Sequence, residues 1–174
     1  MQPSDSKTTQ CTALVQGPSG QPPRRCLRTT RLVPYCTAHA KSIWGVRLGP
    51  STIEGAGQGL FAARDFVPAR RTCKLTTGSR TKPVFVADYG GEVKGIDHTS
   101  HNAYGLAIGN DQMLDAAYVR GWGAMANDGG ATRNNAKLAV SRSGEEGVRC
   151  RVMATKTIRD GEEILVPYGP SYWT

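Results

Sequence analysis

Apolar residues along this chain come in short runs that are interrupted by glycine, proline and polar residues. Val148, Cys150 and Val152 alternate with arginines, which is the period of a strand with one buried face. Near the C-terminal end, a turn at residues 161 to 163 precedes the apolar run 164 to 166, which predicts another strand. The pattern therefore indicates a mainly β protein of short strands and loops.

Helical periodicity is scarce in the sequence. The 174 residues include 21 glycines and 10 prolines, and we expect brief helices only around residues 62 to 66 and 118 to 126. A chain of this length has room for one good core and buries roughly 70% of its unfolded surface on folding. We expect one larger β domain with a small N-terminal appendage.

The charge is concentrated at the N-terminal end. Residues 1 to 50 hold seven Lys and Arg residues but one acid, Asp5, and so carry most of the formal net charge of +8. Such a basic segment is usually a solvated face, but it equally suits contact with nucleic acid or an acidic partner. The sequence has no secretory signal and no apolar run of the roughly eighteen residues that a membrane span requires. We expect a soluble, intracellular protein.

The same segment contains Cys11, Cys26, Cys36 and His39 in the spacing C-x14-C-x9-C-x2-H. Three thiolates and one imidazole are a tetrahedral zinc set, and the short spacing of the last two suits a zinc knuckle. Because few apolar residues surround them, the metal would have to supply the folding free energy. The alternative is a set of unrelated thiols in an unfolded tail.

The remaining cysteines, Cys73 and Cys150, receive no functional role. A total of five cysteines is odd, which together with the missing secretory signal argues against a disulfide framework. A cysteine buried in a strand is usually inert.

A glycine-rich loop is the first candidate ligand site. Gly55, Gly57 and Gly59 alternate with other residues and leave the backbone uncovered, so that a polar cofactor could approach the main chain closely. The alternative is a tight turn that leads into a strand.

Two further segments carry polar or aromatic groups next to turns. Residues 124 to 130 place Asn127 and Asp128 after a small apolar run, where their side chains can bind loop backbone or a ligand. Residues 161 to 169 read as a turn and a strand that end at Tyr168.

Taken in this order, the motifs resemble the SET-domain family of protein lysine methyltransferases. The matching segments are an opening strand and glycine motif at 46 to 66, a Tyr-x-Gly-Glu-like segment at 86 to 93, strands at 104 to 108 and 114 to 116, the place of the Asn-His-Ser-Cys-x-Pro-Asn motif at 127 to 136, and the Gly-Glu-Glu-Leu-x-x-x-Tyr-Gly signature at 161 to 169. The resemblance implies a β-clip fold of short curled sheets with a C-terminal pseudoknot and few short helices. The N-terminal segment resembles a small Cys3His zinc module, which we place at residues 1 to 41, before a catalytic domain at 42 to 174.

The resemblance also implies roles for individual residues. Tyr168 would be the catalytic tyrosine, and its hydroxyl would orient the substrate amine, because a phenol of pKa about 10 is a poor base at neutral pH. Tyr89 would line the lysine channel, with Tyr104 as a second candidate, although strand tyrosines often only pack. The residues implied in binding S-adenosylmethionine are Gly57, Gln58, Gly59, Asn127, Asp128, Tyr168 and Trp173, of which Trp173, or alternatively Tyr172, would stack on the purine.

The chain departs from the family pattern at several positions. Asp128 stands in the place of the family's His and can only accept hydrogen bonds, which puts cofactor affinity in doubt. Ala124 replaces an Arg, and no cysteine-rich tail follows Gly169. Leu138 lies near a position where a tyrosine restricts product size, and a leucine leaves room for more than one methyl group.

We predict from these features a nuclear, S-adenosylmethionine-dependent protein lysine N-methyltransferase that acts on histone tails. The alternatives are a non-histone lysine methyltransferase, a non-catalytic SET-like chromatin interaction protein, and a zinc-dependent nucleic-acid-binding protein whose larger domain is a scaffold. Candidate contacts for a basic peptide are Glu92, Glu145, Glu146, Glu162 and Glu163.

Overall fold

The computed structural model describes residues 7–17, 19, 21–72, 79–96, 103–143 and 147–169. The N-terminal elements are β1 (Thr9–Gln10), β2 (Leu14–Val15), β3 (Arg24–Arg25), β4 (Thr29–Thr30), β5 (Leu32–Val33), the α-helical turn α1 (Thr37–His39) and the π-helical turn η2 (Ala40–Trp44). They are followed by β6 (Val46–Pro50), β7 (Gln58–Ala62), β8 (Ala69–Thr72), β9 (Ser79–Lys82), β10 (Val84–Asp88), β11 (Glu92–Gly95), β12 (Gly105–Gly109), β13 (Gln112–Asp115), β14 (Arg120–Gly121), the 3₁₀ helix η3 (Trp122–Met125), α2 (Gly130–Arg133), β15 (Ala136–Ser143) and β16 (Gly147–Ala154).

The described residues are mainly strand with few short helices, which confirms the predicted fold class. The strands form small sheets with the orders β10-β16-β15 and β11-β13-β12, together with two-stranded pairs such as β6-β7. The predicted alternation in β16 is confirmed, because Cys150 and Val152 are buried while their neighbours are more exposed. None of the described helices is long and apolar enough to cross a membrane.

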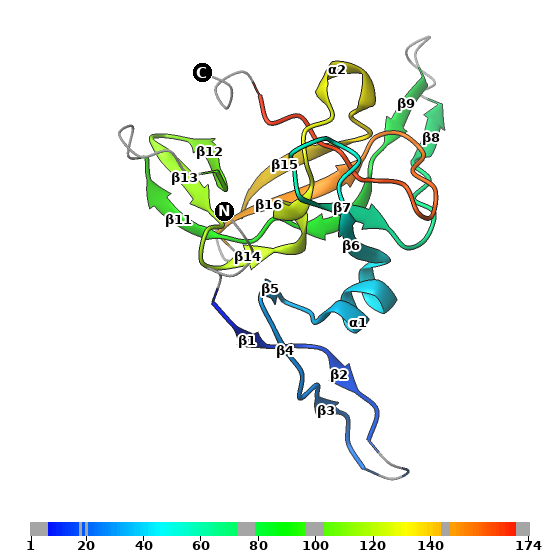
Figure 1. The fold of residues 1–174 in the computed structure, drawn as a ribbon, viewed down its shortest axis with the longest axis vertical. Helices are drawn as coiled ribbons and strands as arrows, with labels where there is room; N and C mark the ends of the chain where they lie inside the picture. Colours follow the sequence, from blue (N-terminus) through cyan, green and yellow to red (C-terminus); the bar gives the residue numbers. More distant parts are fainter. Residues whose placement is uncertain are drawn as a thin grey trace.

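The N-terminal strands form short ladders of their own, β1 with β4 and β2 with β3. In Figure 1 the β2–β3 hairpin points away from the larger domain, whereas β5 lies beside β14. The join to the domain is a shared core: Trp122 is buried and donates its indole N–H to the Tyr35 carbonyl at 2.9 Å, and Leu32 and Trp44 belong to the same apolar cluster. The division expected at residues 41 and 42 falls inside η2.

The C-terminal segment passes between three earlier parts of the chain, as the predicted pseudoknot requires. The amide of Ile164 donates to Leu60 in β7 at 2.8 Å, and the amide of Val166 donates to the Asn127 carbonyl at 2.9 Å. On a third side, the Asn135 amide donates to the Leu165 carbonyl at 3.1 Å. These bonds bring the candidate site segments together.

The helix predictions were only partly correct. A helix around 62 to 66 is wrong, because Ala62 ends β7 and Phe66 instead exchanges two backbone hydrogen bonds with Ile158. Tertiary pairing overrides a weak local preference there. Within 118 to 126, η3 is the helix that forms.

Candidate active site and metal centre

The loop between β6 and β7 leaves its main chain open on one side. The Ser51 amide closes the loop on the Gly57 carbonyl at 2.8 Å, and Gly55 and Gly57 have φ values of 75° and 70°. A Cβ atom built on either glycine would meet no atom within 4 Å. The loop therefore offers the uncovered backbone that a closely bound cofactor needs.

The first two residues of β7, Gln58 and Gly59, contact Asn127 and Glu163. A Cβ atom on Gly59 would overlap the Glu163 carboxylate and lie 3.1 Å from the Asn127 amide nitrogen, so only glycine fits. Gln58 has an exposed side chain, and its carbonyl accepts from the Asn127 side chain at 3.1 Å. Both residues lie where the loop meets Asn127.

Glu163 is the polar centre beneath this loop. Its carboxylate accepts hydrogen bonds from the Ser51 hydroxyl at 2.7 Å, the Thr52 amide at 2.7 Å, the Thr52 hydroxyl at 2.6 Å and the Asn127 side chain at 3.2 Å. Burial raises its pKa, but the hydrogen bonds from Thr52 and Ser51 outweigh that effect and hold the pKa below its ordinary value of 4.5. The expectation that Glu163 contacts a substrate peptide is wrong, because the residue is only 6% exposed and its carboxylate is bound inside the protein.

Asp128 connects the loop at residues 128 to 134 to Tyr168, the catalytic candidate. One of its carboxylate oxygens accepts from the Gly130 amide at 2.8 Å and from the Asn134 side chain at 3.0 Å. The other accepts from the Tyr168 amide at 2.9 Å. Its carboxylate thus organises the protein's own backbone.

Tyr168 is held at both ends. Asp128 binds its amide, and its hydroxyl donates to the Ala126 carbonyl at 3.1 Å. The ring is partly buried and packs against the main apolar cluster. Its hydroxyl is therefore fixed beside the segment that leads into Asn127.

The two channel candidates lie in a second apolar cluster. Tyr89 is 8% exposed, and its hydroxyl donates to the Tyr104 carbonyl at 3.2 Å. Leu138 packs against this cluster and also against the cluster that contains Tyr168.

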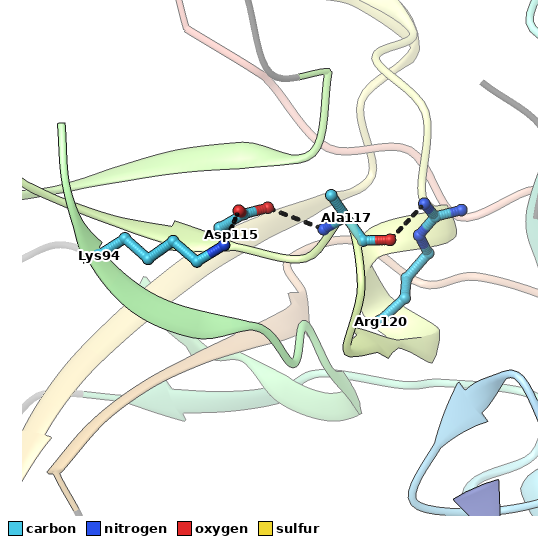
Figure 2. A network of polar contacts seen from close by, with 4 residues as sticks. All are labelled: Lys94, Asp115, Ala117 and Arg120. Atoms are coloured by element: carbon cyan, nitrogen blue, oxygen red, sulfur yellow. Dashed lines mark hydrogen bonds and ion pairs between the residues drawn. The ribbon is translucent and has the colours of Figure 1, made fainter. Parts of the chain in front are cut away.

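A buried arginine that the sequence analysis did not single out lies against Tyr104. Arg120 is fully buried, and its guanidinium carbon lies 3.5 Å from the Tyr104 ring centroid. Its side chain donates to the carbonyls of Ala116 and Ala117, and Figure 2 shows that the Ala117 amide in turn binds Asp115, the partner of Lys94 at 2.6 Å. The network fixes the turn before η3 and places a permanent positive charge beside the tyrosine cluster.

Some sequence-predicted residues fall outside the part of the chain that the structure describes. They are Trp173, Tyr172, Cys73, Glu145 and Glu146.

The four predicted metal ligands lie together in the N-terminal module. The ligand atoms of Cys11, Cys26, Cys36 and His39 all lie within 4.8 Å of one another, and His39 Nδ1 is 3.4 Å from both Cys11 Sγ and Cys36 Sγ. A tetrahedral zinc ion separates its sulfur and nitrogen ligands by about 3.6 to 3.8 Å, so the donor set and its spacing fit zinc. The predicted Cys3His cluster is confirmed.

Comparison with known proteins gives one consistent result. The chain matches no protein-family model and no curated protein. Solved structures of the Polycomb repressive complex 2 of Chaetomium thermophilum do resemble it. One, in an autoinhibited conformation bound to S-adenosylmethionine, is 26% identical with a TM-score of 0.55 over 72% of this chain and 15% of that chain. The crystal structure of the complex is 26% identical with a TM-score of 0.54 over 71% and 15%.

The chain has the SET-domain fold. It spans about 15% of the length of the chains that it resembles. Within this SET domain, hydrogen bonds join Asn127 to Glu163 and Asp128 to Tyr168, so the C-terminal segment connects the cofactor candidates to the catalytic candidate. Tyr89 and Tyr104 belong to the second apolar cluster, and Leu138 packs between that cluster and the one that Tyr168 contacts. Sequence reasoning missed Ser51 and Thr52, although two hydroxyl residues directly before the glycine loop were a readable signal.

The cysteine cluster is itself most of the core of the module that precedes the SET domain. Its buried residues are Cys11, Ala13, Cys26 and Cys36, so little apolar surface would hold the strands β1 to β4 in place without a metal. We predict that the purified protein carries a single zinc ion per chain and that Cys36→Ser loses it, measured by elemental mass spectrometry. Cys150→Ala, which removes a thiol far from the ligand set in sequence, should keep the metal. Zinc-free wild-type protein, or full zinc content in Cys36→Ser, would contradict this assignment.

Proposed function

We propose that this SET domain is an S-adenosylmethionine-dependent protein lysine N-methyltransferase. The observation that carries the proposal is the position of Tyr168, whose hydroxyl is fixed on the Ala126 carbonyl while its amide is bound by Asp128. Asn127, which lies between these two residues in the chain, donates to Ser51 and Gln58 at the two ends of the open glycine loop. A similar structure is described as bound to S-adenosylmethionine. We assign Gly57, Gln58, Gly59, Asn127 and Asp128 to the cofactor side, as expected from the sequence.

The substrate we propose is a lysine of a histone tail. One similar structure, 26% identical with a TM-score of 0.55 over 71% of this chain, is described as a complex with H3K27me3 and H3K27M. A histone substrate would place the protein in the nucleus. The division into a zinc module at 1 to 41 and a catalytic domain at 42 to 174 belongs to the same proposal.

The chemistry asks the protein for orientation more than for a base. S-adenosylmethionine supplies an electrophilic methyl group when bound. A free lysine has a pKa of about 10.4, and burial among apolar and aromatic side chains lowers it towards the neutral, nucleophilic form. A phenol that donates its proton to a carbonyl, as Tyr168 does to Ala126, presents its oxygen lone pairs as acceptors, which suits it to orient an amine N–H. Tyr89 and Tyr104 would line the approach.

One observation favours a non-catalytic chromatin interaction protein as the second candidate. Asp128 accepts from the Gly130 amide, the Asn134 side chain and the Tyr168 amide, and a carboxylate has no proton to donate to an adenine ring. If cofactor affinity is lost for this reason, the fold would persist without turnover.

The N-terminal module supports a further proposal, contact with nucleic acid. Residues 7 to 50 contain seven bases and no acid. A cavity of about 650 Å³ is lined by Arg28 and Arg31 of the module and by Leu48 and Trp122 of the SET domain. The two arginines are exposed, and their guanidinium groups suit contact with phosphate groups.

We predict that Tyr168→Phe lowers methyl transfer by about a hundredfold or more, because the amine loses its orienting group. The measurement is incorporation of labelled methyl groups into core histones and nucleosomes. Tyr118→Phe, at a tyrosine that is 63% exposed, is the matched control and should transfer at the wild-type rate. Equal rates for Tyr168→Phe and wild type would refute the catalytic role. Absence of both transfer and cofactor binding in wild type would favour the non-catalytic candidate.

We predict that wild-type protein binds duplex DNA in a salt-dependent manner and that Arg28→Ala with Arg31→Ala reduces the slope of log K against log salt by about 2, one for each lost phosphate contact. Fluorescence anisotropy at several salt concentrations measures this slope. Lys137→Ala, which removes an exposed base on β15 of the SET domain, should leave it unchanged. Absent or salt-independent binding would end the proposal.

A further inference from the structure

We propose that Glu163 is the positioning residue that sets the cofactor affinity of this SET domain, by holding the glycine loop on the C-terminal segment. The inference rests on the proposed function, because it concerns the same cofactor site. Glu163 is buried and its carboxylate is bound within the protein, which suits it to position other groups.

The loop has few other anchors. Among the described residues, the hydrogen bonds that join residues 51 to 57 to other segments run through Ser51 and Thr52 alone. Three of them end on the Glu163 carboxylate, and the others come from the side chains of Asn127 and Arg133. The remaining bonds of the loop stay within it: the Ser51 amide donates to the Gly57 carbonyl, the Ala56 amide to the Ile53 carbonyl, and the Ile53 amide to the Ser51 hydroxyl. Beyond the β6–β7 ladder, which ends at the Pro50–Gln58 pair, the open glycines are therefore held by the attachment at Ser51 and Thr52.

The carboxylate also fixes the other side of the cofactor site. The Asn127 side chain donates to Glu163, to the Ser51 hydroxyl and to the Gln58 carbonyl. Arg133 of α2 donates to the Thr52 hydroxyl, which itself donates to Glu163. A single buried anion thus connects the glycine loop, Asn127 and α2 to the segment that carries Tyr168.

An ionised carboxylate suits this task in a way that an amide does not. One oxygen of Glu163 accepts from Ser51 and Asn127, and the other accepts twice from Thr52. A glutamine would turn its NH₂ group towards one of these pairs of donors, where it could accept nothing. Hydrogen bonds to a charged group are also stronger than those to a neutral one, so replacing the carboxylate with an amide weakens the attachment of the loop. The strands around the loop keep their own ladder hydrogen bonds, and we expect them to stay folded.

The test compares wild type, Glu163→Gln and Glu54→Gln by titration calorimetry with S-adenosylmethionine. We expect Glu163→Gln to keep one site per chain while its Kd rises about tenfold, which corresponds to the loss of one charge-assisted hydrogen bond. In turnover, KM for S-adenosylmethionine should rise while kcat at saturation changes little. Glu54→Gln removes the same charge from an exposed position of the same loop and should leave Kd unchanged.

Amide hydrogen exchange of the cofactor-free protein supplies an independent readout. Exchange of residues 52 to 57 should be faster in Glu163→Gln than in wild type, because their attachment is weakened. A residue that only adds global stability would lower the melting temperature and leave both Kd and the local exchange pattern of the folded protein as they are.

The outcomes separate the inference from the proposed function. If wild type does not bind S-adenosylmethionine, the proposed function fails and the inference fails with it, whatever the exchange data show of the loop. If wild type binds and Glu163→Gln binds with the same Kd, or Glu54→Gln weakens binding equally, the inference alone is overturned. Should Glu163→Gln not fold, Thr52→Val removes one hydroxyl donor and should raise Kd by a smaller factor, and an unchanged Kd there would also overturn it.

Discussion

The constraint on which the rest of this structure depends is the passage of the C-terminal segment between β7, Asn127 and Asn135. Ile164 and Val166 are fully buried, and their amides donate to the carbonyls of Leu60 and Asn127. Because Glu163 precedes this pair and Tyr168 follows it, the same segment carries the anion that holds the glycine loop and the tyrosine proposed for catalysis. Site geometry and folding therefore share one set of hydrogen bonds.

Burial of Glu163 shows how charge and packing are matched at this point. An acid that is 6% exposed would be costly if unpaired, and here its two oxygens receive hydrogen bonds from Ser51, Thr52 and Asn127. The absence of a side chain at Gly59 provides the space. Arg120 presents the opposite case, since the described residues offer it two carbonyls and the Tyr104 ring but no acceptor for its Nη1 atom. Both residues are fixed parts of the interior: Glu163 lies beneath the glycine loop, and Arg120 lies against Tyr104.

Much of this arrangement could be predicted from sequence, and the failures have physical reasons. The order of short motifs indicated the fold, and the alternation around Cys150 and the spacing of Cys36 and His39 indicated a buried strand and a ligand cluster. Nothing local distinguished Glu163 from Glu162, because Ser51 and Thr52, which donate to Glu163, lie more than a hundred residues earlier in the chain. Burial of Arg120 likewise depends on Tyr104 and on carbonyls of its own turn. Contacts that depend on how the chain is folded in space, rather than on a regular spacing of apolar residues, have no periodic signature.

If the glycine loop and the Asn127 segment together form a cofactor site, S-adenosylmethionine should slow amide hydrogen exchange in both segments. We expect cofactor-dependent protection at residues 55 to 59 and 126 to 128, with little change in the zinc module. Protection elsewhere in the chain, or none at a saturating concentration of the cofactor, would contradict it.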